Sequence, residues 1–425
     1  MGQVARWRRP GTSPEARSLA LARMASAGSK PPGSPAEAAA WLARDAVECL
    51  PVGALERRLA AAAGEGRPLR VKLGVDPTAP DIHLGHTVVL RKLREFQDLG
   101  HVVVLIVGDY TARVGDPSGR SQIRPVLSGD EIDRNATTFQ EQALSVLRSD
   151  RLEVRRNGEW LGMPMEELFV LARTATVAQI LERDDFAKRI AASAPISVLE
   201  LLYPLLQGYD SVAVRADVEL GGTDQKFNLL LGRDIQRAYG QPEQIALTMP
   251  ILPGTDGERK MAKSLDNYVG VTESPAEMYA KTLSIPDAAL GTWHSLLLGV
   301  AAPEGLAPRD AKRALARELV TRFHGTQAAA AAEARFDRVH VDHRPPDDVP
   351  DAEFASDGAE EVHVPALLAA TFGVSRGEAR RLIAQRGVRV GGDSLGPGEL
   401  DLPRARVDGA IVQLGRRRFA RVRLT

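Results

Sequence analysis

The sequence predicts an α/β fold, in which a parallel β-sheet is followed by a helical segment and then by a small α+β module. Two apolar runs, at residues 69–75 and 101–109, predict buried strands, and apolar side chains recur at helical spacing between them. A strand, a helix and a second strand within about 40 residues make a βαβ unit. The second run is almost continuously apolar, which is typical of a parallel strand covered on both faces.

The rest of the sheet domain follows from shorter patterns. A helical pattern runs over residues 38–63, and residues 130–200 predict several helices that interrupt the sheet. Short strands are predicted at 217–220 and 245–252, and the first of them passes into a helix. We therefore expect one sheet-containing domain over residues 39–271.

Three further segments complete the chain of 425 residues, a length that favours two or three domains. A serine, a proline and a glutamate at 274–277 predict the first turn of a helical domain over residues 272–341. Residues 342–361 hold eight acidic side chains and three prolines, which predicts a solvated linker. The last module, residues 362–425, combines two short helices with short strands.

The first 38 residues hold six basic and two acidic side chains among several Pro, Gly and Ser residues, and we expect them to be disordered. They fit a targeting peptide that lacks the apolar core of a secretory signal, and a true start at Met24 fits equally well. No apolar run approaches the length of a membrane span. The single cysteine, Cys49, excludes a disulfide framework and a cysteine-based zinc site. These features favour a cytoplasmic protein.

The stretch KLGVDPTAPDIHLGH at residues 72–86 connects the first strand to its helix. His83, Gly85 and His86 fall at the opening of that helix, where unpaired N–H groups and the positive end of the dipole suit a phosphate. Both histidines can donate hydrogen bonds to phosphate oxygens, and the glycine lets a flat ring such as adenine approach the backbone. Taken alone, the pattern fits two surface histidines on an amphipathic helix equally well.

The sequence KMAKS at residues 260–264 lies between a Gly-rich turn and a polar stretch. Two lysines on a mobile loop can bring positive charge onto a leaving polyphosphate. By itself the segment fits a solvated basic loop, but its occurrence with the histidine motif on one α/β sheet weakens that explanation. The two stretches resemble the signature pair of class I aminoacyl-tRNA synthetases, usually written HIGH and KMSKS.

A third group of residues resembles one family within that class. Tyr203, Gln207 and Asp210 are spaced by four and three residues, as on one face of a helix, although each alone fits a polar residue facing water. GGTDQ follows at 221–225, and DPSG occurs at 116–119. With KLGxDPTAPDxHLGH, the combination is similar to bacterial tyrosyl-tRNA synthetases over most of the chain after about residue 65.

The resemblance implies a Rossmann-like catalytic domain that activates tyrosine with ATP and then transfers it to tRNA. It places the histidines and a threonine at the ATP phosphates, the glycine under the adenine, the lysines at the departing pyrophosphate and an aspartate at the ribose. ATP would arrive with Mg²⁺ as a substrate, and neither a tightly bound cofactor nor a protein metal site is implied. The residues in these roles are His83, His86, Thr78, Gly85, Lys260, Lys263 and Asp224.

For tyrosine, the resemblance implies three side chains that hold the amino group, a carboxylate that accepts the phenol hydrogen bond, and a glutamine near the substrate carboxylate. These residues are, in that order, Asp116, Tyr203 and Gln207, then Asp210, then Gln225. Two positions depart from the family pattern. A small hydroxyl is missing at Ala262, where we expect little effect. Lys72 stands where many relatives carry a tyrosine that makes a second phenol contact, and the resemblance gives Lys72 no role.

The formal charge of the chain is zero, but residues 362–425 hold 12 Arg and no Lys against 5 acids. A basic module on a mildly acidic body suggests a nucleic-acid partner. The module resembles an S4-type RNA-binding domain, which implies tRNA(Tyr) as the partner, and the family implies a homodimer. Five arginines on its capped helix and the following turn are candidates for phosphate contacts, namely Arg376, Arg380, Arg381, Arg386 and Arg389.

Three other functions fit parts of the sequence. Tryptophanyl-tRNA synthetases share the histidine and lysine motifs, but the helix with Asp210, the GGTDQ stretch and the basic tail argue against them. A small-molecule nucleotidyltransferase can also use the histidine motif, yet it would not explain an RNA-binding module. A non-catalytic RNA-binding regulator would not need both phosphate motifs. Pyrophosphate exchange with ATP, tested over all amino acids, separates these functions.

Overall fold

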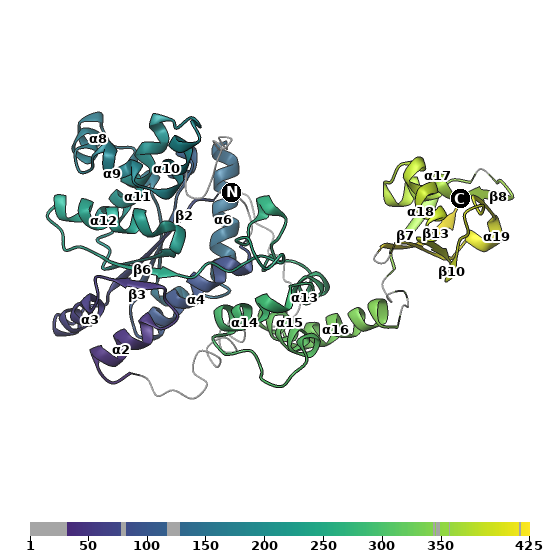
Figure 1. The fold of residues 1–425 in the computed structure, drawn as a ribbon, viewed down its shortest axis with the longest axis horizontal. Coiled ribbons are helices and arrows are strands. Elements are labelled where there is room, and N and C mark those ends of the chain that lie inside the picture. Colours follow the sequence, from purple (N-terminus) through teal and green to yellow (C-terminus); the bar gives the residue numbers. More distant parts are fainter. Residues whose placement is uncertain are drawn as a thin grey trace, which may run out of the picture. The chain divides into compact units, whose positions relative to one another are not determined.

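The computed structural model describes residues 32–77, 82–116, 128–342, 345, 349–356, 358–415 and 418–425. The chain divides into two compact units, Met1–Thr326 and Gln327–Thr425, and Figure 1 shows the helices and strands of each. Most of the predicted leader lies outside the described residues. Its last four residues belong to helix α2 (Pro35–Ala43), whose first turn is capped by the Ser34 side chain.

Within the described residues, a six-stranded sheet forms the centre of the first unit, in the order β1-β6-β5-β2-β3-β4. The strands from β6 to β4 run parallel to their neighbours, and β1 joins the edge antiparallel. The predicted α/β fold with a parallel sheet is therefore confirmed. The strands are β1 (Glu48–Leu50), β2 (Arg70–Val75), β3 (Val102–Val107), β4 (Leu152–Arg156), β5 (Val218–Gly222) and β6 (Ile245–Met249).

Two edge strands of this sheet correct the sequence analysis. Strand β1 interrupts the helix predicted over residues 38–63, which is split into α2 and α3 (Ala54–Gly64). Strand β4 lies within residues 130–200, where only helices were predicted. Both strands are short and half-buried, so neither has the continuous apolar run that marks a central parallel strand.

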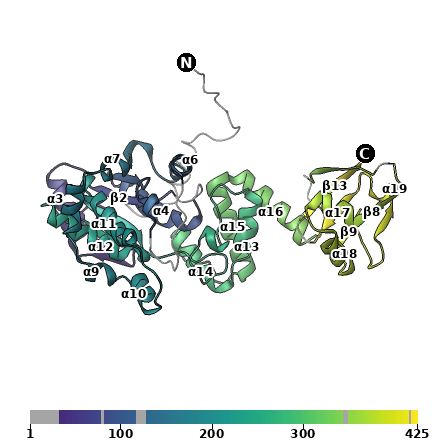
Figure 2. The ribbon, with the colours of Figure 1, turned by 90° about the horizontal axis from the view of Figure 1, so that it is seen from above.

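Helices cover both faces of the sheet. Helix α4 (Leu84–Asp98) buries its apolar stripe on one face, while α11 (Val198–Ala213) and α12 (Lys226–Ala238) pack together on the other, as Figures 1 and 2 show. Strand β2 lies between β3 and β5, so the chain leaves it on one side and later returns on the other. Loops at the carboxyl ends of strands separate at such a switch point, and ligands bind there in open α/β sheets.

The remaining helices of the first unit lie in two groups along the chain. The start of α13 is as predicted, with Pro275 in the first turn and the Ser274 side chain accepting the Glu277 N–H. The helices before β5 are α5 (Thr111–Val114), α6 (Gly129–Ala143), α7 (Gly158–Leu161), α8 (Met165–Ala172), α9 (Val177–Leu181) and α10 (Asp184–Ala191). Those after the sheet are α13 (Pro275–Leu283), α14 (Leu290–Trp293) and α15 (Pro308–His324). Helix α16 (Thr326–His340) begins at the last residue of the first unit and otherwise belongs to the second.

The second unit has its own apolar core under a sheet in the order β10-β9-β12-β13-β7. Strand β7 (Asp351–Phe354) pairs parallel with β13 (Arg418–Leu424), so part of the predicted linker is a sheet strand. The acidic composition of this segment predicts a linker, but every second side chain of the strand, Ala352 and Phe354, is partly buried. The other elements are β8 (Glu361–His363), α17 (Val364–Phe372), α18 (Arg376–Ala384), β9 (Val388–Val390), β10 (Asp393–Ser394), β11 (Asp401–Pro403), α19 (Arg404–Val407) and β12 (Ile411–Leu414).

No helix in the described part of the chain is both long and apolar enough to cross a membrane.

Candidate active site

The structure brings the histidine motif and the segment that follows KMAKS together. The Leu84 N–H donates to the Val269 carbonyl at 2.9 Å, and the Val271 N–H donates to the Ile82 carbonyl at 2.9 Å. Residues 82–84 and 269–271 therefore form a short antiparallel pair at the start of α4. Two motifs that are about 175 residues apart in sequence lie side by side at one end of the sheet.

Both histidines of this motif are neutral at physiological pH. Burial lowers the pKa of His83 to about 2, with further lowering by the charges of His86, Lys263 and Lys260. Burial, followed by the charge of Lys263, lowers the pKa of His86 to about 4. His86 Nδ1 accepts the His83 backbone N–H at 3.2 Å, so the proton of the neutral ring lies on Nε2. His86 can therefore offer an Nε2–H donor to a phosphate oxygen without carrying a charge.

Gly85 lies in a narrow space between the two motifs. A Cβ atom at this position would be 3.0 Å from the His83 ring and 3.6 Å from Met261 Cβ. Met261, the second residue of KMAKS, is buried, and its N–H donates to the Leu252 carbonyl at 3.0 Å. The first motif therefore packs directly against the second through their smallest and most apolar residues.

Asn267 holds the lysine loop in shape. Its side chain accepts the Ala262 N–H at 2.9 Å and donates to Asp256 Oδ2 at 2.9 Å and to the Lys260 carbonyl at 3.1 Å. Lys260 Nζ lies 3.3 Å from Asp224 Oδ2, which links the loop to the predicted ribose contact. Lys263 Nζ lies 5.8 Å from the centre of the Tyr268 ring. Lys260 thus pairs with Pro253 in a short antiparallel bridge, and Lys263 begins the 3-10 turn Lys263–Leu265. The remaining predicted phosphate contact, Thr78, lies outside the described residues.

Asp76, directly after β2, joins Thr111, which follows β3, to Tyr203 on α11. The Tyr203 hydroxyl donates to Asp76 Oδ2 at 2.9 Å, and the Thr111 hydroxyl donates to Asp76 Oδ1 at 2.7 Å. A Cβ atom at Gly108 would be only 2.1 Å from Asp76 Oδ1, so this close approach requires a glycine. Burial and the nearby carboxylates, including Asp116, raise the pKa of Tyr203 well above its ordinary value.

Asp210 is a buried carboxylate with neutral hydrogen-bond donors. Trp160 Nε1 donates to Asp210 Oδ1 at 2.8 Å, and Asn157 Nδ2 donates to Asp210 Oδ2 at 3.4 Å. Burial raises the pKa of Asp210 to about 7, although these two donors and the charge of Lys72 lower it. Asp210 therefore ionises near neutral pH and can accept a hydrogen bond from a hydroxyl group.

The other predicted tyrosine contacts form one hydrogen-bonded chain. Asn228 Nδ2 donates to Gln207 Oε1 at 2.7 Å and to Gln225 Oε1 at 3.2 Å. Gln225 Nε2 in turn donates to Asp116 Oδ2 at 3.1 Å. The structure thus connects Gln207, Gln225 and Asp116, while Tyr203 precedes Gln207 by one helical turn on α11.

Comparisons with known proteins agree with this geometry. The family model described as tRNA synthetases class I (W and Y) matches residues 64–340, which is more than half of the chain. The chain belongs to this family. It is 49% identical over 394 residues to the tyrosine–tRNA ligase of Moorella thermoacetica, covering 90% of this chain and 94% of that protein. It is 46% identical over 402 residues to the tyrosine–tRNA ligase of Geobacter sulfurreducens, covering 92% of this chain and 99% of that protein.

A solved structure supports the fold of this class I tRNA synthetase. The crystal structure of the tyrosyl-tRNA synthetase from Archaeoglobus fulgidus, complexed with L-tyrosine, covers 70% of this chain and 99% of its own. The TM-score is 0.56 at 22% sequence identity, so the likeness concerns the fold.

Several polar residues of the synthetase site escaped the sequence analysis. Asp76, Thr111 and Asn157 follow directly or closely on the carboxyl ends of β2, β3 and β4. For Asp76 and Thr111, the position after a predicted strand was an available signal. For Asn157 there is no such signal, because the sequence predicts helices and no strand over residues 130–200.

The five arginines predicted to bind RNA are all exposed on the second unit, on and after α18. Among the described residues, none of the five guanidinium groups has an ion-pair or hydrogen-bond partner, whereas several other arginines of this unit have one. Arg406 pairs with Glu399 at 3.0 Å, Arg423 pairs with Asp351 at 3.0 Å, and Arg404 donates to the Leu424 carbonyl at 3.3 Å. In the described part of this unit, the charge of these five side chains is not neutralised by an ion pair, and we expect it to be available to phosphates.

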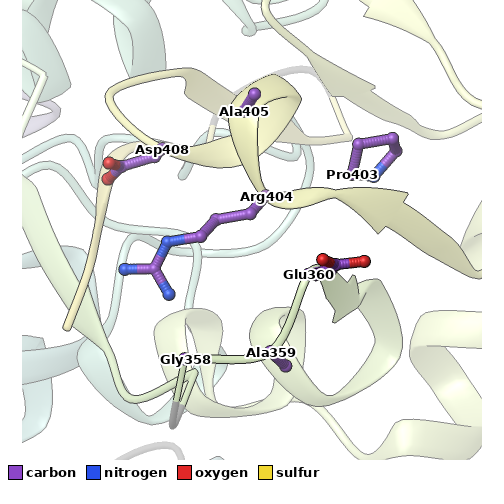
Figure 3. A pocket seen from close by; sticks show the side chains of 7 residues that line it. All are labelled: Gly358, Ala359, Glu360, Pro403, Arg404, Ala405 and Asp408. Carbon is purple, nitrogen blue, oxygen red and sulfur yellow. The ribbon is translucent and has the colours of Figure 1, made fainter.

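A cavity of about 430 Å³ also lies in the second unit, between the segment before β8 and the start of α19. Figure 3 shows the Arg404 side chain lying among Gly358, Glu360 and Asp408 in this cavity. None of the predicted ATP, tyrosine or RNA contacts lines it.

Proposed function

We propose that this protein is a tyrosine–tRNA ligase that works in two steps. L-tyrosine and ATP first form tyrosyl-adenylate and pyrophosphate, and the tyrosyl group then moves to the 3′-terminal adenosine of tRNA(Tyr). Family membership supports this assignment, as do curated relatives named tyrosine–tRNA ligase at 45–49% identity over 87–92% of the chain.

The observation that carries the choice of tyrosine is the buried Asp210 carboxylate. A phenol hydroxyl offers it a donor, so the carboxylate would keep a full set of hydrogen bonds with tyrosine bound. Phenylalanine would bury the same carboxylate without that donor, which costs about 1–3 kcal/mol or more for a charged group. In this assignment, the amino and carboxylate groups of the amino acid lie among four further side chains, those of Asp116, Tyr203, Gln207 and Gln225.

Adenylation needs no protein nucleophile. The tyrosine carboxylate attacks the α-phosphate, a new C–O–P link forms, and pyrophosphate leaves with its charge. The Nε2–H of His86 and the ring of His83 contact phosphate oxygens, and Lys260 and Lys263 neutralise the leaving group. Mg²⁺ enters as part of the ATP substrate and adds to this neutralisation. Thr78, Gly85 and Asp224 complete the ATP contacts in our assignment.

The finer organisation follows the same proposal. Residues 39–271 are the catalytic domain, residues 272–341 a helical domain that contacts tRNA, and residues 362–425 an S4-like domain whose unpaired arginines bind tRNA phosphates. We place the protein in the cytoplasm.

We also propose a homodimer, which forms through exposed apolar side chains on α8 to α11. This apolar patch consists of Met165, Phe169, Val170, Val177, Ile190, Val198 and Leu199.

Exchange of radiolabelled pyrophosphate into ATP, measured over all twenty amino acids, tests the function. Tyrosine is expected to support exchange, and tryptophan and phenylalanine are not. Exchange with tryptophan alone would identify the other branch of the family, and exchange without any amino acid would indicate a nucleotidyltransferase. Charging of tRNA(Tyr) transcripts then tests the second step.

A further inference from the structure

Lys72 and Glu219 form an ion pair in the centre of the sheet. They face each other in register on the neighbouring strands β2 and β5, at the switch point of the sheet. Lys72 Nζ lies 2.9 Å from Glu219 Oε1, and the two side chains are 0% and 1% exposed. Lys72 is also the residue to which the family pattern gave no role.

Both members of this pair are bonded to the turn of α11 that carries Asp210. Lys72 Nζ donates to the Gln207 carbonyl at 2.9 Å and to Ser211 Oγ at 2.7 Å. Glu219 accepts Gln207 Nε2 at 3.3 Å and Ser211 Oγ at 3.2 Å, and Gln244 also donates to it. The two bonded residues of α11, Gln207 and Ser211, lie on either side of Asp210 in sequence. The ion pair therefore fixes the position of this turn relative to the sheet.

The charges of the pair act on Asp210 in opposite directions. The ammonium of Lys72 lowers the pKa of Asp210, and the carboxylate of Glu219 raises it. Among the described residues, Tyr203 on the same helix also interacts electrostatically with Asp210, and Asp76 and Asp116 interact with Tyr203. The donors from the segment after β4, Asn157 and Trp160, are neutral.

We propose that Lys72 and Glu219 are positioning residues for tyrosine recognition, which hold the 207–211 turn of α11 in place and balance the charge around the Asp210 carboxylate. The pair reaches the substrate only through Asp210 and Gln207. The proposal rests on the proposed function, because it takes Asp210 as the acceptor for the phenol hydroxyl. A buried ion pair is weak evidence of a stabilising role, since apolar replacements are often as stable, so its hydrogen bonds to the site turn carry the argument.

The pH dependence of tyrosine activation tests this proposal. Phenol recognition needs the ionised carboxylate, so kcat/KM for tyrosine rises with pH through the pKa of Asp210. Lys72→Met should move the midpoint up by about one pH unit or more, and Glu219→Gln should move it down. At pH 7, a rise of one unit would lower kcat/KM for tyrosine about fivefold by the loss of ionised carboxylate, with little change for phenylalanine.

A matched control is the buried pair Lys92–Glu95 on α4, with Nζ 2.6 Å from Oε2 and exposures of 0% and 2%. Lys92→Met should lower thermal stability but leave the midpoint and the tyrosine-to-phenylalanine ratio unchanged. The double variant Lys72→Met/Glu219→Gln removes both charges and should return the midpoint close to the wild-type value. It also serves as the folded reference if Lys72→Met does not fold.

Opposite shifts in the two single variants support the proposal. An unshifted midpoint in Glu219→Gln, with tyrosine and phenylalanine rates reduced in equal proportion, would overturn it and leave the pair a purely structural one. A wild-type enzyme that fails to activate tyrosine would instead refute the proposed function, so the two failures are distinguishable.

Discussion

At the scale of single residues, burial sets the charge of the side chains in the candidate site. The pKa values of His83 and His86, lowered to about 2 and 4, keep both rings neutral over the physiological range. In our assignment they act as hydrogen-bond donors, and the lysines of the loop supply the fixed positive charge at the phosphates. Because the pKa of Asp210 is raised to about 7, we expect tyrosine binding to weaken as the pH falls below neutrality and this carboxylate becomes protonated.

Asp210→Asn should weaken discrimination against phenylalanine. The substitution exchanges a charged acceptor for a neutral amide, and charge-assisted hydrogen bonds are roughly twice as strong as neutral ones. We expect kcat/KM for tyrosine to fall by about 10- to 100-fold, corresponding to about 1.5–3 kcal/mol, while phenylalanine changes little. Pyrophosphate exchange with both amino acids measures the ratio, and an unchanged ratio would remove Asp210 from this role.

His83→Ala, His86→Ala and Lys263→Ala should each slow tyrosyl-adenylate formation while leaving the Kd for tyrosine nearly unchanged. The reason is that charge develops on the phosphates in the transition state and not on the bound amino acid. Each lost contact should cost about 2–4 kcal/mol of activation free energy. Single-turnover adenylate formation, with tyrosine binding measured on the same preparations, separates the two effects. Wild-type rates in all three variants would contradict the assignment.

At the scale of elements, the sequence predicts those helices and strands that have a continuous or regularly spaced apolar pattern. The central strands, α4 and the helix carrying Asp210 all follow from runs of apolar or regularly spaced residues. Strands β1, β4 and β7 were missed because an edge strand is short and partly solvated, so its composition resembles that of a helix or a linker. The contacts between Asp76, Thr111 and Asn157 depend on which strand ends are neighbours, and that order is not written in any local pattern.

The lysine loop is the element whose order most directly affects catalysis. Asn267→Ala removes four side-chain hydrogen bonds that connect the two ends of the loop, and a hydrogen bond of this kind contributes about 1 kcal/mol. We expect a several-fold higher KM for ATP and faster proteolysis within residues 254–268, with the Kd for tyrosine unchanged. Limited proteolysis and exchange kinetics test this, and Asn267→Asp should not restore the order, because its carboxylate would face the Asp256 carboxylate. Equal loop protection in wild type and Asn267→Ala would argue against it.

At the scale of the whole molecule, our assignment places the chemistry of tyrosine and the RNA-binding arginines in different parts of the chain. Every predicted ATP and tyrosine contact lies before residue 264, and the unpaired arginines lie after residue 375. Strand β7 belongs to the second sheet, so a truncation that separates the two functions must end before residue 351 and not at residue 362.

Deletion of residues 341–425 should therefore leave tyrosine-dependent pyrophosphate exchange largely intact and lower tRNA charging at least about tenfold, because the phosphate contacts are lost. In the full-length protein, replacing the five arginines by glutamine should reduce the salt dependence of tRNA binding. Both activities are measured on the same preparations. Loss of exchange on truncation would show that the tail is part of the catalytic fold, and unchanged charging would show that its basic surface is only solvated.

The apolar patch on α8 to α11 gives a prediction about assembly. Val198, 76% exposed, should be buried in the proposed dimer, so Val198→Asp should yield a monomer in sedimentation analysis because a charge is costly to bury unpaired. Val300, 55% exposed and outside the patch, provides the control, and Val300→Asp should remain dimeric. A dimeric Val198→Asp protein would place the interface elsewhere.

Helix α11 has a consequence for how this site can evolve. It presents Tyr203, Gln207 and Asp210 at spacings of four and three, and an α-helix advances about 100° per residue. One inserted or deleted residue between Tyr203 and Gln207 would rotate part of this set by more than a quarter turn and separate it from the Lys72–Glu219 pair below. The amino-acid preference of the site can therefore change by substitutions along this helix, but not by insertions or deletions that change its length.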